Sequence, residues 1–244
     1  MGHSHPSYLS ATRHPWPCLL FLLPLLAAYE GGVFWLGGAQ APAVRNGADA
    51  WLRWGFELFG VKALLAVPAA VVVILIGWTI WRWGDRPSDN LGICFGMTME
   101  SVLFAFGLWA VSRNFSRLLE GLGLPLAAQV TVPSDTLAQI ITYVGAGIYE
   151  EVLFRLILFA GLAAVLRYAF VPGWLALLMA AVTSALLFAG AHHIGPYGEP
   201  FDPFVFVFRV AAGLYFTLVF WCRGFGIAVG AHAGYDVLVG VPWR

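Results

Sequence analysis

The sequence predicts an all-α, polytopic membrane protein built as a bundle of about seven (six to eight) transmembrane helices. Of its 244 residues, 60% are hydrophobic and only 11% are charged. The hydrophobic residues gather in runs of about 20, which is the length of helix that crosses a bilayer. This composition is too apolar for a soluble globular protein. We therefore expect a single integral membrane domain over residues 1–244, in contact with the lipid bilayer.

Seven apolar runs are candidate membrane helices, and tryptophans mark many of their ends, as expected at membrane interfaces. The runs are Trp16–Leu36, Leu64–Trp81, Leu91–Val111, Leu137–Leu166, Trp174–Ala191, Phe204–Trp221 and Phe225–Val241. The first run contains Pro17 and Pro24 and lacks a clear small-residue cleavage site. It is therefore expected to be a retained helix rather than a cleaved signal peptide.

Two connecting segments predict amphipathic helices that lie in the membrane interface. Asp49, Arg53 and Glu57 are spaced at i, i+4 and i+8, and hydrophobic residues occupy the other faces. Arg113 and Arg117 show a similar pattern before the glycine- and proline-containing segment 121–125. The basic residues divide five to seven between the two sets of loops, which is too small a difference to decide the orientation in the membrane.

Charge and cysteine content exclude several classes of function. The 13 basic residues are scattered singly and the net charge is zero, so no nucleic-acid partner is expected. The three cysteines also lie singly, without the spacing of a metal site, and are expected to be small core residues rather than disulfide partners.

The most unusual segment is Glu-Glu-Val-Leu-Phe-Arg at residues 150–155, inside an otherwise apolar run. Ionisable groups at membrane depth cost roughly 2.5–3.5 kcal/mol each on insertion scales and commonly mark functional sites. Glu151 and Arg155 are four residues apart and share a helix face, which predicts an ion pair. Glu150 has no such partner, whereas Gly145 and Gly147 allow a helix or a substrate to approach it closely. Glu150 is thus a candidate proton acceptor; the alternative is a buried charge network that only locks helices together.

Histidines occur in two later helices at the same four-residue spacing. Phe188 precedes His192, and His232 precedes Asp236 among Gly226, Gly230 and Gly234. Each pair alone is weak evidence, because a histidine at a helix end is commonly satisfied by a backbone carbonyl. Glu30 and Glu100 also lie in or near apolar runs but have no basic neighbour at helical spacing. Glu30 is expected near a helix end, and Glu100 is expected to support the structure or line a cavity.

Together these motifs resemble the CAAX protease and bacteriocin-processing (CPBP, or Abi) family of intramembrane proteases. The residues that carry the resemblance are, in order, Glu150-Glu151-x-x-x-Arg155, Phe188-x-x-x-His192 and His232-x-x-x-Asp236. The resemblance makes residues 136–244 a CPBP-like catalytic core, preceded by N-terminal helices without a family motif over residues 1–135.

The resemblance implies a water-accessible cavity in which Glu150 and His192 activate the hydrolytic water and His232 and Asp236 stabilise the oxyanion. An ionised Asp236 would repel an oxyanion, so an orienting role toward His232 is favoured for it. Glu151, Arg155 and Phe188 are expected to support the site. The resemblance leaves the mechanism open between glutamate-type and metal-dependent hydrolysis. If a metal such as zinc takes part, its expected ligands are Glu150, His192 and His232.

The sequence therefore favours an intramembrane endopeptidase that acts on membrane-anchored or C-terminally processed peptides, in a prokaryotic cytoplasmic (inner) membrane. Four other classes stay open: a metal-dependent hydrolase of a non-peptide substrate, an ion or proton transporter, a non-catalytic scaffold or immunity protein, and a haem-binding bundle. An ion or proton transporter would have polar groups spread over the depth of several helices, whereas the polar groups of this sequence gather in three motifs. The haem bundle leaves Glu150 without a role.

Overall fold

The computed structural model describes residues 7–38, 45–123, 136–195 and 198–241, and within these ranges the regular structure is entirely helical. The elements are α1 (Tyr8–Ala11), α2 (Pro15–Gly37), α4 (Gly47–Leu58), α5 (Ala66–Trp81), η2 (Trp83–Asp85), α6 (Asn90–Gly121), α7 (Thr136–Glu151), η3 (Val152–Phe159), α8 (Ala160–Tyr168), α9 (Gly173–Ala191), α10 (Pro203–Arg223) and α11 (Phe225–Gly240).

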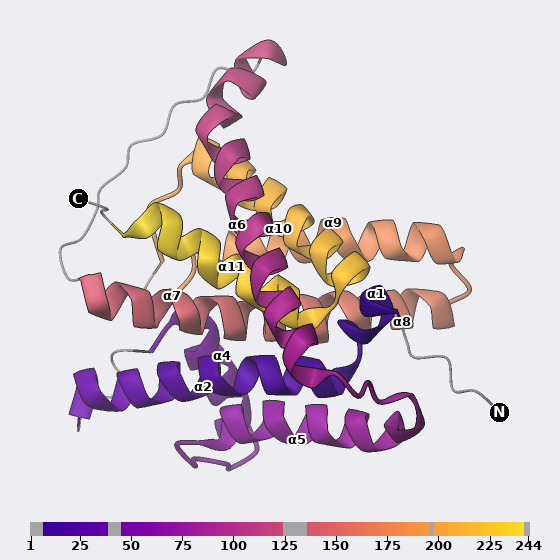
Figure 1. Ribbon diagram of the computed structural model, residues 1–244. Helices are drawn as coiled ribbons and strands as arrows, with labels where there is room; N and C mark the ends of the chain where they lie inside the picture. Colours follow the sequence, from indigo (N-terminus) through magenta and orange to yellow (C-terminus); the bar gives the residue numbers. More distant parts are fainter. Residues whose placement is uncertain (1–6, 39–44, 124–135, 196–197, 242–244) are drawn as a thin grey trace.

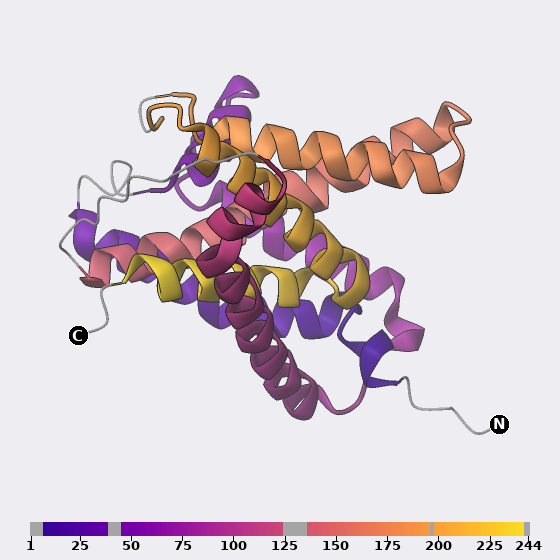
Figure 2. The ribbon, with the colours of Figure 1, turned by 90° about the horizontal axis from the view of Figure 1, so that it is seen from above.

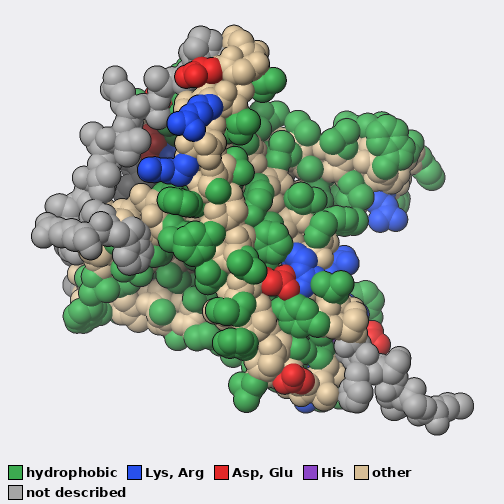
Figure 3. Space-filling view, turned by 45° about the horizontal axis from the view of Figure 1, so that its top comes forward, with side chains coloured by type: hydrophobic (Ala, Val, Ile, Leu, Met, Phe, Trp, Pro, Cys, Tyr) green, Lys and Arg blue, Asp and Glu red, His purple; other side chains and the backbone are tan. Residues whose placement is uncertain are grey.

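Four of these helices, α2, α6, α9 and α10, are long and apolar enough to cross a membrane. Helices α5 and α11 are apolar but have only 16 residues each. The predicted run Leu137–Leu166 is divided among α7, the π-helical η3 and α8. The all-α membrane fold is confirmed, while the number of seven spans stays a prediction. Hydrophobic side chains dominate the face seen in Figure 3, with charges confined to a few places, as expected for a protein surrounded by lipid.

Helices α7 and α11 lie side by side near the middle of the molecule (Figure 1). Helix α6 crosses α11 steeply, and α2 packs along α7 with α5 against its outer side. Helices α8 and α9 form a hairpin that projects from the rest of the molecule, as Figure 2 shows from above. Helix α10 packs between α9 and α11 and joins this hairpin to the centre.

Helix starts are set by local capping groups that satisfy otherwise free backbone N–H groups. The Nδ1 atom of His14 accepts from the backbone N–H of Trp16 at the start of α2. The Asp202 carboxylate accepts from two backbone N–H groups at the start of α10, where Pro203 occupies the first helical position. Gly224, with φ +98°, separates α10 from α11. Only glycine adopts such a backbone readily.

Small residues bring α11 and α6 into close contact. A Cβ atom at Gly226 would meet Met97, one at Gly230 would meet Ser101, and one at Gly234 would lie 3.2 Å from the Cβ of Ala105. Both triplets follow an i, i+4, i+8 spacing, so one face of each helix forms the contact. This packing fixes the depth and rotation of α11, which carries His232 and Asp236.

The two predicted interfacial helices have different outcomes. Helix α4 is present, but Asp49 on its charged face is fully buried, whereas Trp54, Leu58 and Phe59 are exposed. The second prediction is wrong, because Arg113 and Arg117 lie in the last turns of α6, which continues without a break to Gly121. The helix formed by the preceding apolar run extends through these two arginines. The change from apolar to charged residues therefore does not mark the start of a new helix.

Candidate active site

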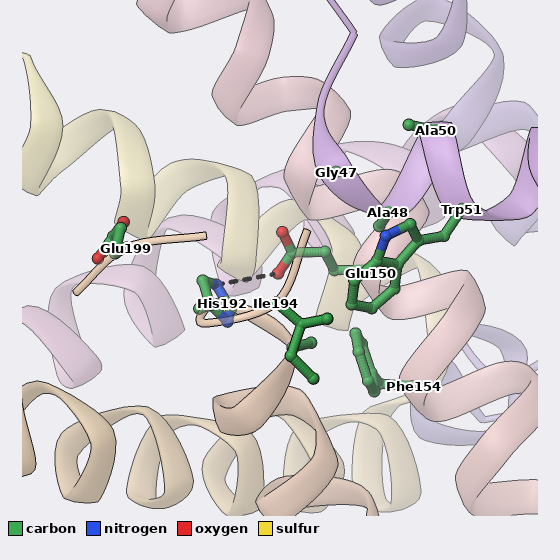
Figure 4. A pocket seen from close by; sticks show the side chains of 10 residues that line it. Gly47, Ala48, Ala50, Trp51, Glu150, Phe154, His192, Ile194 and Glu199 are labelled. Atoms are coloured by element: carbon green, nitrogen blue, oxygen red, sulfur yellow. Dashed lines mark ion pairs between the residues drawn. The ribbon is translucent and has the colours of Figure 1, made fainter. Parts of the chain in front are cut away.

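Glu150 occupies the last turn of α7, and one of its carboxylate oxygens faces both histidines. The distance from Glu150 Oε2 to His192 Nε2 is 3.9 Å, and that to His232 Nε2 is 3.8 Å. This oxygen is buried and has no hydrogen-bond partner among the described residues. A buried carboxylate oxygen without a partner costs free energy, so it is suited to bind a molecule that enters the site. Figure 4 shows Glu150 and His192 turned toward each other.

His192 caps the C-terminal end of α9, and its ring is fixed by its own helix. Its Nδ1–H donates to the carbonyl oxygen of Phe188 at 2.8 Å, so the Nε2 atom that faces Glu150 carries the lone pair. The ring of Phe188 contacts both histidines, with centroid distances of 5.0 Å to His192 and 5.9 Å to His232. Phe188 thus holds the two imidazoles at a fixed separation.

His232 lies on α11 and is held by groups from three helices. Its Nδ1–H donates to Glu151 Oε1 at 2.8 Å, and its ring stacks on Phe216 at 4.4 Å. Its Nε2 atom lies 3.5 Å from Asp236 Oδ2 as well as 3.8 Å from Glu150. The Nδ1 proton is therefore oriented by Glu151, and not by Asp236, to which the sequence analysis gave the orienting role. Asp236 instead lies beside the nitrogen that faces Glu150.

The pair Glu151–Arg155 supports this arrangement from behind. Arg155 Nη1 lies 3.0 Å from Glu151 Oε1, so the ion pair expected from the four-residue spacing is present. Arg155 is fully buried, donates from Nη2 to the carbonyl oxygen of Gly213 and packs over the ring of Phe188 at 4.5 Å. Because one oxygen of Glu151 serves both Arg155 and His232, the ion pair also fixes the histidine.

Two cavities meet at Glu150 and His192. The larger, of about 500 Å³, reaches past His232 and Asp236 to the side chain of Arg209. The smaller, of about 220 Å³, is lined on its apolar side by residues of α4, η3 and the segment after α9: Ala48, Ala50, Trp51, Phe154 and Ile194. Figure 4 shows the smaller cavity. Their combined size suits a short stretch of peptide, with the histidines and Glu150 at the junction.

A metal centre was one of the sequence expectations. Among the described residues, no group of three His, Cys, Asp or Glu side chains is arranged to hold a metal ion. Glu150, His192 and His232, the ligands expected for zinc, do not form such a group in this arrangement. We therefore derive no chemical step through a metal.

A second buried charge network, which was not predicted from the sequence, contacts the same helix. Arg45 binds both Glu30 and Asp49, with N–O distances of 2.8 and 2.7 Å, and the hydroxyl of Tyr149 donates to Glu30 at 2.7 Å. Tyr149 directly precedes Glu150, so this network anchors α7 to α2 and α4. The four-residue spacing of Arg45 and Asp49 was a usable signal, but the link to Glu30 depends on tertiary packing.

Glu100, for which a supporting role was expected, lies outside the active-site cavity. Its carboxylate accepts from Nε and Nη2 of Arg223 at 2.6 and 2.7 Å. Cys18, Cys94 and Cys222 are all free. Only Cys18 is buried and Cys222 is exposed, so the prediction that all three are core residues is wrong for Cys222.

A known protein family matches the part of the chain that carries the three motifs. Residues 132–238 match the family described as Type II CAAX prenyl endopeptidase Rce1-like. This range includes every motif residue from Glu150 to Asp236. No curated protein and no solved structure matches the chain. The resemblance drawn from the motifs is therefore confirmed over residues 132–238, which are similar to the Rce1-like family of CAAX endopeptidases.

Proposed function

We propose that this protein is an integral membrane endopeptidase in which Glu150 and His192 activate a water molecule for attack on a peptide carbonyl. The observation that carries the proposal is the buried Oε2 atom of Glu150, which has no hydrogen-bond partner in the described part of the chain and faces the Nε2 atoms of His192 and His232 at 3.9 and 3.8 Å. The match of residues 132–238 to a CAAX endopeptidase family supports CAAX-type intramembrane proteolysis in general terms. The residue roles below are our inference from the geometry.

Glu150 acts as the general base in this mechanism. A water molecule between Glu150 and His192 donates one hydrogen to each of them, because Oε2 and the His192 Nε2 lone pair are both acceptors. As the water oxygen bonds to the carbonyl carbon, its proton passes to Glu150. Glu150 then gives this proton to the leaving amine nitrogen as the C–N bond breaks. The products are a new amine and a new C-terminal carboxylic acid, which releases the second proton of the water to solvent.

His232 stabilises the tetrahedral intermediate. Its Nδ1–H is engaged by Glu151, so it donates to the developing oxyanion from Nε2 when the ring is protonated. Glu150 and Glu151 also lie beside the ring, and their negative charge favours the imidazolium. Asp236 lies 3.5 Å from the same Nε2 atom and is protonated in this step, because an ionised carboxylate there would repel the oxyanion. No nucleophilic serine or cysteine is needed.

We further propose that the substrates are membrane-anchored or C-terminally processed peptides, and that the protein works in a prokaryotic cytoplasmic membrane. An ion or proton transporter and a non-catalytic scaffold are the alternatives. Both predict that the protein cleaves nothing, so a hydrolysis assay separates them from the endopeptidase.

The test uses purified protein in lipid vesicles with a farnesylated peptide, and mass spectrometry to count cleaved ends. Glu150→Gln keeps the shape of the side chain but removes the base, so the rate is expected to fall at least about 100-fold. The matched control is Glu57→Gln, which changes an exposed carboxylate on α4 and should leave the rate unchanged. A Glu150→Gln variant with wild-type activity would refute the assignment. Loss of activity on chelation, restored by zinc, would favour the metal-dependent alternative.

A further inference from the structure

Arg209 has no part in the mechanism above, yet it lines the same cavity. It lies on α10, and its side chain is only 17% exposed. The larger cavity extends from Glu150, His192 and His232 to this residue. The charge of Arg209 also acts electrostatically on Glu150, His192 and Asp236. A positive group therefore lies beside the reaction centre without being used by it.

Among the described residues, the Arg209 guanidinium has hydrogen-bond partners at Nη2 but not at Nη1. Nη2 donates to both carboxylate oxygens of Glu199, at 3.0 and 2.9 Å. Nη1 is buried and has no hydrogen-bond partner among the described residues. An unsatisfied buried donor on a charged group is costly, and it favours an anion that can fill the position.

Two other arginines among the described residues pair with more than one carboxylate, although each also has one buried nitrogen without a hydrogen-bond partner there. Arg45 and Arg53 each lie within ion-pair distance of two carboxylates, those of Glu30 and Asp49. Within the described part of the chain, Arg209 pairs with one carboxylate, that of Glu199. A second carboxylate at Nη1 would give Arg209 the same number of acidic partners as Arg45.

We propose that Arg209 binds the C-terminal carboxylate of the substrate through Nη1. This role presupposes the proposed endopeptidase activity and adds the direction in which the substrate lies. The peptide enters the larger cavity with its C-terminal end toward Arg209, and the bond to be cut lies at Glu150 and His192. The segment before that bond occupies the smaller cavity, beside Trp51, Phe154 and Ile194.

The test measures binding to the Glu150→Gln protein, so that it does not depend on hydrolysis. The probes are two farnesylated peptides of one sequence, one with a free C-terminal carboxylate and one with a carboxamide. The free acid is expected to bind about 10- to 100-fold more tightly, the range for a buried hydrogen bond between charged groups. Adding Arg209→Gln should bring the Kd of the acid to that of the amide and leave the Kd of the amide unchanged.

Glu199→Gln is the matched control, because it breaks the same ion pair and retains Arg209. The preference for the acid should persist or increase in this variant. Equal weakening of both peptides by Arg209→Gln and Glu199→Gln would show that the pair is only structural and would overturn the proposal. Equal affinity of the two peptides for the Glu150→Gln protein, or no binding of either, would also overturn it. So would an amidated peptide with a terminal aspartate that regains full affinity, because Arg209 would then read a side chain. If the wild-type protein cleaves neither peptide in vesicles while the Glu150→Gln protein still prefers the free acid, the result counts against the proposed hydrolysis and not against the role of Arg209.

Discussion

Arg155 connects the structural and the chemical parts of the site through one oxygen atom. Its guanidinium lies 3.0 Å from Glu151 Oε1, the same atom that accepts from His232 Nδ1–H at 2.8 Å. Arg155 therefore neutralises the carboxylate that orients His232. A buried carboxylate left without its cation is strongly destabilising, whatever role the neighbouring groups play in catalysis.

Replacing Arg155 by alanine is expected to reduce folded protein as well as activity. The change leaves Glu151 buried without its cation, at a cost of roughly 3–5 kcal/mol. Thermal unfolding in detergent and the yield of monodisperse protein measure the effect. Arg167→Ala, which removes an exposed arginine of α8, is the control and should behave as the wild type. A normal melting temperature for Arg155→Ala would contradict the buried ion pair.

Sequence spacing predicted contacts within one helix better than contacts between helices. The pair Glu151–Arg155 follows from the four-residue period and is present. The contact between Glu151 and His232 joins residues 81 positions apart, and nothing local in the sequence indicates it. For the same reason Asp236 was predicted to orient His232, because it is the acid nearest to this histidine along the chain.

At the scale of elements, the start of α2 depends on a neutral histidine. His14 accepts from the N–H of Trp16 at Nδ1 and donates to the carbonyl oxygen of Arg82 from Nε2, at 3.1 and 3.0 Å. Protonation of Nδ1 removes the acceptor that caps the helix. Burial lowers the pKa of His14 below its ordinary value of 6.5, because the charged ring is poorly solvated.

The stabilisation by His14 is therefore expected to depend on pH. The folded protein binds the proton less readily than the unfolded chain, so the stabilisation is fully present above about pH 6.5 and is lost as pH falls through the lowered pKa. His14→Asn retains a capping side chain that does not titrate. Between pH 7.5 and pH 5 the melting temperature of the wild type should fall further than that of His14→Asn. An equal difference at both pH values would exclude this role.

The contact between α7 and α11 depends on Gly147. A Cβ atom there would lie 2.7 Å from the backbone nitrogen and 2.9 Å from the Cα atom of Ala233. Since backbone atoms cannot rotate away, Gly147→Ala is expected to separate the helices that carry Glu150 and His232. Overpacking of this kind costs about 1–3 kcal/mol, and cleavage should fall as well.

The control for this substitution is Gly161→Ala in α8, where nothing lies within 4 Å of the new Cβ. Alanine favours helix more than glycine does, so this variant should be as stable as the wild type or slightly more stable. Melting temperatures and cleavage rates of the two variants are compared side by side. Equal behaviour of the two would show that the close approach at Gly147 is unimportant.

Hydrophobic runs located the helices well, because burial in lipid requires a continuous apolar segment whatever the tertiary fold. They were less informative about helix ends and local geometry. Helix α6 continues past Arg113 and Arg117, and the stretch after Glu151 is π-helical in η3. Such stretches are common at functional sites, but hydropathy carries no signal for them.

At the scale of the whole molecule, the N-terminal helices hold the site although they carry no family motif. Helix α2 packs on α7, α6 packs on α11, and the Glu30–Arg45 pair binds Tyr149 beside Glu150. The sequence predicted the membrane class and the family, because composition and the three motifs are local properties. It could not place Glu30 beside Arg45, because that contact brings together a membrane helix and the segment that leads into α4.

The most direct test of the central claim compares protein termini in cells that express the wild type and cells that express Glu150→Gln at equal abundance. Mass spectrometry of membrane proteins should find a set of new C-terminal ends in the wild-type cells that is absent from the variant. That set would also name the substrates. Identical termini in the two cell populations, with both proteins folded in the membrane, would contradict proteolysis by Glu150.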